Sequence, residues 1–442
     1  MRVLFGTDGI RGKADQYPLD APTMAALGQA LARRLGAGAT VLMGMDTRES
    51  GPGIARALSA GIAAGGARAH FIGIVPTPAV AYLCRTSDAA AGISISASHN
   101  PYDDNGVKIF GHDGMKVPDS DEEQIEDAMR AIRSDVSIPE IELPEDRGLI
   151  EKYERFLAGG VAPEALGGIR VVLDAGNGAA FRIAPEVFRR AGADVRVIND
   201  RPNGRNINEN AGALHPEGLA RAVVEQKAQF GVAFDGDADR AIFSDDAGRI
   251  RDGDEIIYLW ANRLRREGKL TAACVVTTVM SNFGFEQQLR RDGIKLHRAP
   301  VGDKYVLEQM LDCGAILGGE QSGHIIDLTV HTTGDGIHTA LVFGELLARA
   351  QKPFSRLKTF DPTPQILLNQ PVGSKPPLES LPRVQAALTA AEAELGEAGR
   401  VLVRYSGTEN KVRVMVEGPD ESTIKRVAES LRDTLRQEIG PA

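Results

Sequence analysis

Cysteine and aromatic residues are scarce in this chain of 442 residues. It contains three cysteines and one tryptophan, and only 5% of its residues are aromatic. The cysteines, Cys84, Cys274 and Cys313, are far apart and lack the close pairing that is typical of metal sites. An odd number of isolated thiols predicts a reducing compartment and buried structural cysteines.

Long hydrophobic runs and an excess of positive charge are also lacking. The longest uncharged run near the N-terminus, residues 69–84, is interrupted by Pro76 and Pro78 and is too short to span a membrane. The N-terminal sequence MRVLFGTDGIRG has no apolar core of a secretory signal peptide. A net charge of -9 is atypical of proteins that bind nucleic acids or anionic membranes. We therefore predict a cytoplasmic protein that acts on a small molecule and binds neither nucleic acid nor membrane.

What the chain does have is one order of elements that occurs three times. Each copy begins with an apolar strand, continues through a helical stretch to a second strand, and ends with a third strand, a polar loop and a short fourth strand. Strands separated by helices predict βαβ units with mostly parallel sheets, and the fourth strand follows too closely to be parallel to the third. The first strands span 40–45, 169–173 and 273–277, the second strands 69–74, 194–198 and 294–298, and the fourth strands 107–110, 241–244 and 325–328.

The three polar loops occupy equivalent positions after the third strand. Their sequences are SASHN at 96–100, DGDADR at 235–240 and GGEQSGH at 318–324. Ligands of parallel sheets bind at the carboxyl ends of the strands, so we expect the three loops to face one cleft.

The last part of the chain follows a different plan. A proline-rich stretch at 362–377 indicates a linker and a first strand at 365–368, followed by a helix at 381–395 and strands at 401–405 and 412–416. The apolar face of a closing helix is marked by Ile424, Val427, Leu431 and Leu435. The predicted fold class is α/β: three similar mixed, mostly parallel sheet domains and a smaller C-terminal α+β domain. The predicted boundaries are 1–148, 149–252, 253–364 and 365–442.

In the first polar loop, Ser98 and His99 lie on a turn at the end of a strand, and Lys108 follows on the next strand. A hydroxyl held beside an imidazole and an amine is a candidate site for covalent chemistry. The alternative is an ordinary hairpin with a polar tip.

In the second loop, Asp235, Asp237 and Asp239 alternate along DGDADR. Carboxylates this close repel one another unless a cation neutralises them, and oxygen ligands select Mg²⁺, Mn²⁺ or Ca²⁺. An EF-hand is excluded because Arg240 stands where that motif needs glycine, Asp246 where it needs glutamate, and strands flank the loop. The alternative, a solvated acidic turn, is disfavoured by the apolar residues on both sides.

Three further groups are weaker signals. Ser406, Gly407 and Thr408, with Arg404 and Arg413 nearby, could bind phosphate, although such turns are frequent. In the third loop the carboxylate, hydroxyl and imidazole of Glu320, Ser322 and His324 could bind sugar hydroxyls, although isolated histidines are more often structural. At the N-terminus, Arg11 on a glycine-rich segment could reach an anion; the alternative is a tight turn. Lys304 is a further candidate for substrate binding.

Taken together, these motifs resemble the α-D-phosphohexomutase superfamily over essentially the whole chain. Four segments match in order, namely SASHNP at 96–101, DGDADR at 235–240, GEQSGH at 319–324 and RYSGTE at 404–409. Within the superfamily, FGTDGIRG at 5–12 and Gln321 resemble the phosphoglucosamine mutase branch. One departure is Asn410, where the family usually has proline.

The resemblance implies four domains around a central cleft and a role for each motif. Ser98 would carry the phosphoryl group, and Ser94 and Ser96 would be structural. One Mg²⁺ per subunit would be held by phosphorylated Ser98 with Asp235, Asp237 and Asp239. Lys108, its pKa lowered by neighbouring cations such as Arg11 or the metal, would act as general acid and base. The catalytic set is completed by His99 and Arg11, and the substrate-binding set comprises Arg240, Lys304, Glu320, Ser322, His324, Arg404, Ser406, Gly407, Thr408 and Arg413.

The implied reaction converts glucosamine 6-phosphate to glucosamine 1-phosphate through a phosphoserine enzyme and a sugar 1,6-bisphosphate. The same bisphosphate would prime the enzyme, and the product would feed the synthesis of UDP-N-acetylglucosamine and cell-wall precursors. The alternative is a phosphomannomutase/phosphoglucomutase with the same mechanism. A phosphatase or a non-catalytic sugar-phosphate sensor agrees less well with the motifs. A homodimer is one of the assemblies that the sequence leaves open.

Overall fold

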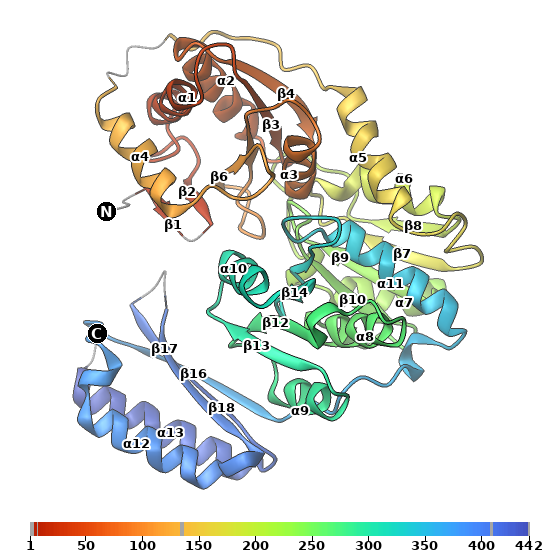
Figure 1. The fold of residues 1–442 in the computed structure, drawn as a ribbon, viewed down its shortest axis with the longest axis vertical. Coiled ribbons are helices and arrows are strands. Elements are labelled where there is room, and N and C mark those ends of the chain that lie inside the picture. Colours follow the sequence, from red (N-terminus) through yellow and green to blue (C-terminus); the bar gives the residue numbers. More distant parts are fainter. Residues whose placement is uncertain (1–3, 7, 133–136, 407–409, 441–442) are drawn as a thin grey trace. The chain divides into compact units, whose positions relative to one another are not determined.

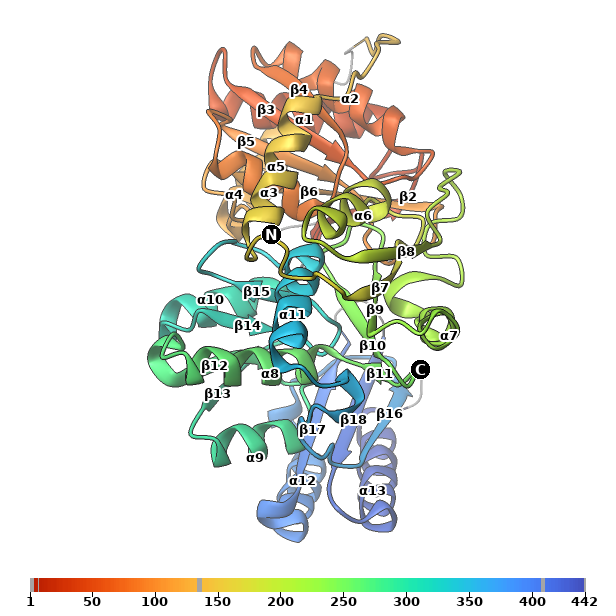
Figure 2. The same cartoon turned by 90° about the vertical axis from the view of Figure 1, so that its right-hand side faces the viewer.

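The computed structural model describes residues 4–6, 8–132, 137–406 and 410–440. The chain forms two compact units, one made of residues 1–278 and 297–358 and the other of 279–296 and 359–442 (Figures 1 and 2). Three sheets with six, five and four strands precede a three-stranded sheet near the C-terminus. This architecture confirms the predicted fold class, whereas the four domain boundaries stay a prediction.

The first sheet has the strand order β1-β2-β6-β5-β3-β4. Strands β3, β4 and β5 are parallel, and β6 runs antiparallel to β5, as its short connection predicts. The strands are β1 (Phe5–Gly6), β2 (Gly9–Lys13), β3 (Thr40–Met45), β4 (Arg68–Ile74), β5 (Ala91–Ile95) and β6 (Asp104–Gly111), and the helices are α1 (Ala21–Leu35), α2 (Gly51–Ala64), α3 (Thr77–Arg85) and α4 (Asp119–Arg130).

Two glycines allow α1 and α2 to pack closely. A Cβ atom on Gly61 would lie 1.9 Å from the carbonyl oxygen of Ala25, and one on Gly28 would lie 2.4 Å from that of Leu58. Any larger residue at either position would force the helices apart. The pair therefore forms a thin layer beside the sheet (Figure 1).

The second and third sheets repeat the same plan. Their strand orders are β11-β10-β9-β7-β8 and β13-β12-β14-β15, and in each the strand after the polar loop, β10 or β15, is antiparallel to its predecessor. The second sheet and its helices comprise α5 (Arg147–Gly159), β7 (Arg170–Asp174), α6 (Ala180–Arg190), β8 (Asp194–Ile198), α7 (Glu217–Gln226), β9 (Phe230–Phe234), β10 (Ala241–Asp245) and β11 (Ile250–Arg251). The third group comprises α8 (Gly253–Arg266), β12 (Cys274–Thr278), α9 (Phe283–Arg291), β13 (Lys295–Ala299), α10 (Asp303–Cys313), β14 (Leu317–Gly319), β15 (Ile325–Asp327) and α11 (Gly336–Ala350).

The C-terminal sheet is antiparallel, with the strand order β16-β18-β17. Its elements are β16 (Gln365–Pro371), α12 (Pro382–Leu395), β17 (Arg400–Tyr405), β18 (Lys411–Glu417) and α13 (Glu421–Ile439). The predicted apolar face of α13 is buried, with Ile424, Val427, Leu431 and Leu435 each at most 4% exposed. Short 3₁₀ turns lie at Gly212–Leu214, Thr271–Ala273, Phe354–Arg356, Leu378–Ser380 and Gly396–Ala398.

The segment around Arg11, for which the sequence left an anion site and a tight turn open, carries two strands. β1 and β2 pair as a hairpin, and β2 pairs with β6 so that Arg11 lies opposite Gly106. This pairing is set by tertiary contacts that glycine-rich sequence alone does not reveal. Within the described residues, no helix is long and apolar enough to cross a membrane.

Candidate active site

Ser98 lies just beyond β5 in a left-handed backbone conformation, with φ of 53°. Its hydroxyl donates a 2.5 Å hydrogen bond to Asp235 Oδ2, and the residue is 1% exposed. The left-handed region costs a non-glycine residue about 1–2 kcal/mol, so the surrounding contacts must hold Ser98 there. Such strain concentrates at functional sites, and it turns this hydroxyl toward the acidic loop.

The two neighbouring serines have other partners. The hydroxyl groups of Ser94 and Thr77 lie 2.6 Å apart, and Ser96 donates to Asp46 Oδ2 at 2.5 Å. Ser96 also accepts the backbone N–H of Ser98 at 2.9 Å. Both are buried supports of the loop, as expected, and Ser98 is the serine of the three that contacts the acidic loop.

Arg48, which the sequence reasoning missed, organises the whole serine loop. Its guanidinium donates to the carbonyl oxygens of Ser98 at 3.0 Å, Asn100 at 2.9 Å and Asp104 at 2.9 Å. Its Nε donates to Asp46 Oδ2 at 2.8 Å, and the side chain is fully buried. The position of Arg48 in the sequence could have indicated this role, because Arg48 follows β3 and therefore lies at the same edge of the sheet as Ser98.

Asp235, Asp237 and Asp239 bring one carboxylate oxygen each to within 4.8 Å of one another. All three are buried, and among the residues that the structure describes Oδ1 of Asp237 and of Asp239 has no hydrogen-bond partner. Burial, together with the charges of the other two aspartates, raises the pKa of Asp235 well above its usual range. A cluster of buried, partly unpartnered carboxylates fits a hard divalent cation such as Mg²⁺.

The serine loop and the aspartate loop are joined directly. Thr77 donates its N–H to the carbonyl oxygen of Asp237 at 3.0 Å and its hydroxyl to Asp237 Oδ2 at 2.6 Å. Asn208 donates to the carbonyl oxygen of Ser98 at 3.0 Å. A Cβ atom on Gly236 would lie 2.5 Å from that same oxygen. The two loops therefore pack as one body.

Lys108 lies on β6 and is fully buried among carboxylates. Its Nζ lies 3.0 Å from Asp237, 3.2 Å from Asp8 and 3.4 Å from Asp239. Burial alone favours the neutral amine, but these three carboxylates outweigh it and raise the pKa of Lys108 well above its usual value. Arg11 does not lower the pKa of Lys108 below its usual value, as the sequence predicted, because the three carboxylates outweigh it; a lowering by a bound metal stays a prediction.

A chain of alternating charges extends from Lys108 toward the third sheet. Asp8 contacts Lys108, Lys116 and Arg11, and Lys116 Nζ lies 2.5 Å from Asp303. Although burial acts in the opposite direction, the cations lower the pKa of Asp8 well below its usual range. Asp8 lies within the FGTDGIRG segment but was not singled out, and Lys116 and Asp303 lie outside the motifs, so the three were missed because they meet only in the fold.

His99, Arg240 and Arg11 form the other side of the Ser98 loop. His99 Nδ1 lies 3.3 Å from the Ser98 hydroxyl and accepts a 3.2 Å hydrogen bond from Arg240. Burial and the charges of Arg240 and Arg11 lower the pKa of His99 to about 4. His99 is therefore a neutral acceptor. Arg11 donates to the carbonyl oxygen of Ala97 at 3.2 Å and so supports the backbone of the Ser98 loop.

Only part of the predicted sugar-binding loop lies against the aspartate cluster. His324 Nδ1 lies 3.6 Å from Asp239, and its Nε2 accepts the N–H of Gly334 at 3.0 Å. Glu320 accepts the N–H of Gly302 at 3.1 Å, and the exposed Ser322 donates to Glu320 at 3.3 Å. Thus His324 is buried against the aspartates, and Glu320 and Ser322 are the outer pair.

Two other residues near this loop have separate partners. Lys304 pairs with Asp119 and lines a 460 Å³ pocket that also contains Lys116 and Asp303. Gln321, which marks the branch in the sequence, donates at 3.0 Å to Asp252, the residue that caps α8. The side chain of Gln321 therefore supports the helix start.

The predicted phosphate loop belongs to the second compact unit. Arg404 and Arg413 face each other across β17 and β18, and burial together with Arg413 lowers the pKa of Arg404. Lys375, a further cation that the sequence reasoning missed, donates to the carbonyl oxygen of buried Ser406 at 2.7 Å. Gly407 and Thr408 lie outside the described residues. Like charges opposed on two strands are destabilising and suit an anionic ligand.

Comparison with known sequences identifies the family. Four domain models described as "Phosphoglucomutase/phosphomannomutase" match in order: alpha/beta/alpha domain I at 2–135, domain II at 151–248, domain III at 252–362 and the C-terminal domain at 367–434. A phosphoglucosamine mutase of Solibacter usitatus is 48% identical, with 99% of each chain covered, and one of Syntrophus aciditrophicus is 44% identical over 100% of each chain. The chain belongs to the phosphoglucosamine mutase family.

Solved structures give the same fold at lower identity. A phosphoglucomutase/phosphomannomutase family protein of Burkholderia thailandensis matches with a TM-score of 0.81 and 23% identity, covering 98% of this chain and 97% of the other. The N-acetylphosphoglucosamine mutase of Aspergillus fumigatus, solved with GlcNAc-6P and magnesium, matches with a TM-score of 0.69 and 18% identity over 99% and 96% of the two chains. These similarities support the fold, and the full-length relatives support the family.

Proposed function

We propose that this member of the phosphoglucosamine mutase family converts glucosamine 6-phosphate to glucosamine 1-phosphate by phosphoryl transfer through Ser98. The observation that carries the proposal is the strained, buried Ser98, whose hydroxyl lies 2.5 Å from a carboxylate of the three-aspartate cluster. This contact joins a nucleophile to a metal site, which phosphoryl transfer requires. The relatives' common name supports glucosamine phosphate over mannose or glucose phosphate.

The metal would be Mg²⁺, held by Asp235, Asp237 and Asp239. Its fit rests on the two unpartnered buried oxygens of Asp237 and Asp239 and on the oxygen-only donor set. When bound, such a cation neutralises the aspartates and the charge of a phosphoryl group on Ser98. The Aspergillus neighbour was solved with magnesium, which supports the same choice here.

The residues around Ser98 would transfer protons and hold the Ser98 backbone in place during the reaction. In transfer to the sugar, the bond between phosphorus and Ser98 Oγ breaks and a bond to the sugar oxygen forms; the sugar hydroxyl loses a proton and Ser98 Oγ gains one. Lys108 is charged at rest, so it is suited to give its proton to Ser98 first and to recover one from the sugar. Arg48 and Asn208 hold the Ser98 backbone still during this exchange.

Phosphate recognition would rest on the arginine pair of the C-terminal sheet. Arg404, Arg413 and Lys375 gather positive charge beside Ser406, and an anion there would offset the repulsion between the arginines. Glu320 and Ser322 would bind sugar hydroxyls, since both are outward polar groups on one loop. An Aspergillus variant was solved with glucose 1,6-bisphosphate, which supports a sugar bisphosphate as the priming molecule.

A cytoplasmic location remains part of the proposal, and the three free thiols support it.

Replacement of Ser98 tests the mechanism. Ser98→Ala should abolish isomerisation of glucosamine 6-phosphate, and intact-mass analysis of the wild type should find one phosphoryl group, mapped to Ser98. Ser87→Ala is the matched control, because the Ser87 hydroxyl lies outside this site, where it donates to the carbonyl oxygen of Leu83 and accepts the N–H of Ala89. Full activity of Ser98→Ala would overturn the mechanism.

The substrate is tested separately on the phosphorylated wild type. Comparison of kcat/KM for the 6-phosphates of glucosamine, mannose and glucose should favour glucosamine by at least tenfold. A preference for mannose phosphate would overturn the substrate assignment while leaving the phosphoserine mechanism intact. Release of inorganic phosphate at the rate of turnover would instead indicate a phosphatase.

A further inference from the structure

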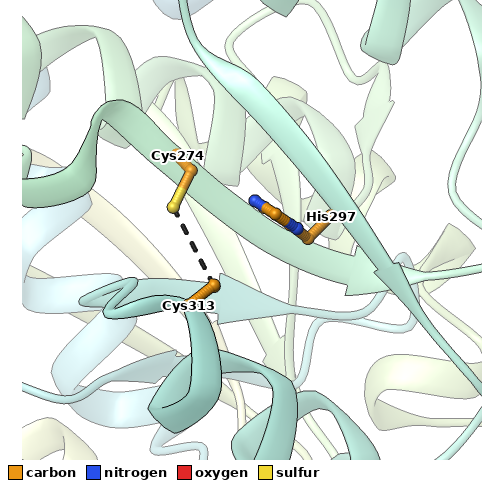
Figure 3. A group of neighbouring side chains, drawn as sticks. All are labelled: Cys274, His297 and Cys313. Carbon is orange, nitrogen blue, oxygen red and sulfur yellow. Dashed lines mark hydrogen bonds between the residues drawn. The ribbon is translucent and has the colours of Figure 1, made fainter.

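Two of the three cysteines, which look isolated in the sequence, meet in the fold. Cys274 begins β12, Cys313 ends α10, and their sulfur atoms lie 4.0 Å apart. His297 on the adjacent strand β13 completes a group whose possible ligand atoms all lie within 4.8 Å of one another (Figure 3). All three residues belong to the first compact unit. Cys274 and Cys313 are therefore neighbours in space, although they are 39 residues apart in the sequence.

The donor set selects a different metal from the aspartate cluster. Two thiolates and a neutral imidazole carry two negative charges, so one divalent cation makes the group electrically neutral. Sulfur and imidazole ligands suit Zn²⁺, whereas the oxygen-only cluster suits Mg²⁺. We propose that Cys274, His297 and Cys313 form a second metal site, specific for zinc or a similarly thiophilic divalent cation.

The geometry supports this site over a disulfide. Zinc binds sulfur at about 2.3 Å, so two sulfurs of one tetrahedral site lie about 3.8 Å apart, close to the separation found here. A disulfide needs its sulfurs at about 2.05 Å and does not involve the imidazole. Cys313 and His297 are half-buried whereas Cys274 is buried, so the cation would approach from their side and keep a water molecule as fourth ligand.

The position of this cluster gives the metal a structural role. It joins the start of β12 and the middle of β13 to the end of α10, and α10 begins at Asp303, which binds Lys116 at 2.5 Å. The preceding Gly302 donates to Glu320 of the predicted sugar loop. A metal at the far end of α10 would thus fix the orientation of the helix that carries Asp303. Because the Ser98 site uses none of the three ligands, this site does not depend on the proposed reaction.

Metal binding by the full-length protein tests the proposal. Reduced wild-type protein in excess Mg²⁺, which fills the aspartate cluster, should bind one equivalent of Co²⁺ and show the ligand-to-metal charge-transfer absorption of cobalt thiolates. Zn²⁺ should displace the Co²⁺ and raise the thermal midpoint by several degrees. Cys313→Ser and His297→Asn change half-buried residues and should lose at least tenfold in Co²⁺ affinity, with the thiolate absorption reduced or absent.

Cys84→Ser is the matched control, because Cys84 is a buried cysteine outside the cluster; it should retain the wild-type spectrum. Wild-type protein without thiolate absorption would overturn the proposal, as would an unchanged spectrum in Cys313→Ser. Isolation of a Cys274–Cys313 disulfide from protein prepared without air, with no Co²⁺ bound, would also overturn it. Circular dichroism of each variant verifies the fold, and Cys313→Ser suffices if His297→Asn is unstable.

Discussion

The ammonium group of Lys108 lies 3.0 Å from Asp237 Oδ2, inside a shell of three carboxylates that keeps it charged. Lys108→Arg preserves the charge but cannot release its proton at any working pH. We expect kcat to fall by about 10²–10⁴-fold, the usual share of a general acid, while substrate binding changes little. Single-turnover transfer from phosphorylated Ser98 measures the step, and Lys13→Arg, on the exposed Lys13–Asp103 pair, is the control. Unchanged transfer in Lys108→Arg would remove Lys108 from the proton pathway.

Asp235 is expected to destabilise the folded protein when no cation is bound to the aspartate cluster. Burial and two neighbouring aspartates disfavour its charge, so Asp235→Asn should raise the thermal midpoint of the metal-free protein by about 2–4 °C per kcal/mol of relieved repulsion. The same variant should lose most of the stabilisation that Mg²⁺ gives the wild type. Thermal scans with EDTA and with Mg²⁺ compare both effects, using the exposed Asp200→Asn as control. Equal Mg²⁺ stabilisation of Asp235→Asn and wild type would contradict the metal assignment.

Arg48 is expected to be the most sensitive residue of the serine loop. Arg48→Met removes a buried cation that is bonded to four backbone carbonyls and leaves the Asp46 carboxylate buried without its cationic partner. Such a loss should reduce the free energy of unfolding by about 3–5 kcal/mol. Urea unfolding measures it, and Arg34→Met, at a partly exposed ion pair with Asp121, should change stability by less than about 1 kcal/mol. A cost as small as that of the control would show that the loop does not need Arg48.

His331 gives the protein an acid-sensitive contact. Its Nδ1 accepts the N–H of Thr332 at 3.0 Å and its Nε2 contacts the carbonyl oxygen of Pro78 at 3.0 Å, so the ring is neutral. Burial, with the charges of His338 and Arg85, lowers the pKa of His331 to about 3. Between that value and the unfolded pKa of about 6.5, the unfolded chain binds more protons, so stability falls as the pH falls through this window.

The loss between pH 6.5 and pH 5 should be about 2 kcal/mol from this residue. His331→Asn keeps an acceptor but does not titrate, so its urea midpoint should depend less on pH over this range. His112→Asn, at an exposed histidine, should keep the wild-type dependence. Identical pH profiles for His331→Asn and wild type would contradict the assignment.

Many strands and helices could be predicted from the sequence, because the patterns of apolar residues that mark them lie within each element. The strand at 40–45 was placed residue for residue, and the antiparallel fourth strands followed from the length of their connections. The structure also brings Ser98 against Asp235 and Lys108 against Asp237, as expected for loops at equivalent strand ends; their catalytic roles stay a proposal.

What the sequence did not reveal depends on distant partners. The hairpin of β1 and β2 exists because β6 offers it an edge, and glycine-rich sequence has little strand propensity of its own. The sequence does not distinguish Arg48 from a surface arginine, because its burial depends on the fold. Cys274 and Cys313 approach each other only because α10 returns its last residue to the start of β12. The sign of the Lys108 pKa shift likewise depends on contacts with Asp237, Asp8 and Asp239 that only the fold creates.

The contacts of Thr77, Asn208 and Gly236 also constrain how such enzymes can be recombined. The domain-model boundaries suggest that residues 2–135 and 151–248 are exchangeable modules, but the hydrogen bonds from Asn208 to Ser98 and from Thr77 to Asp237 cross that division. A chimera that takes the two segments from different parents separates donors from their acceptors and brings unmatched loops against Gly236. An engineered exchange should therefore take both segments from the same parent protein.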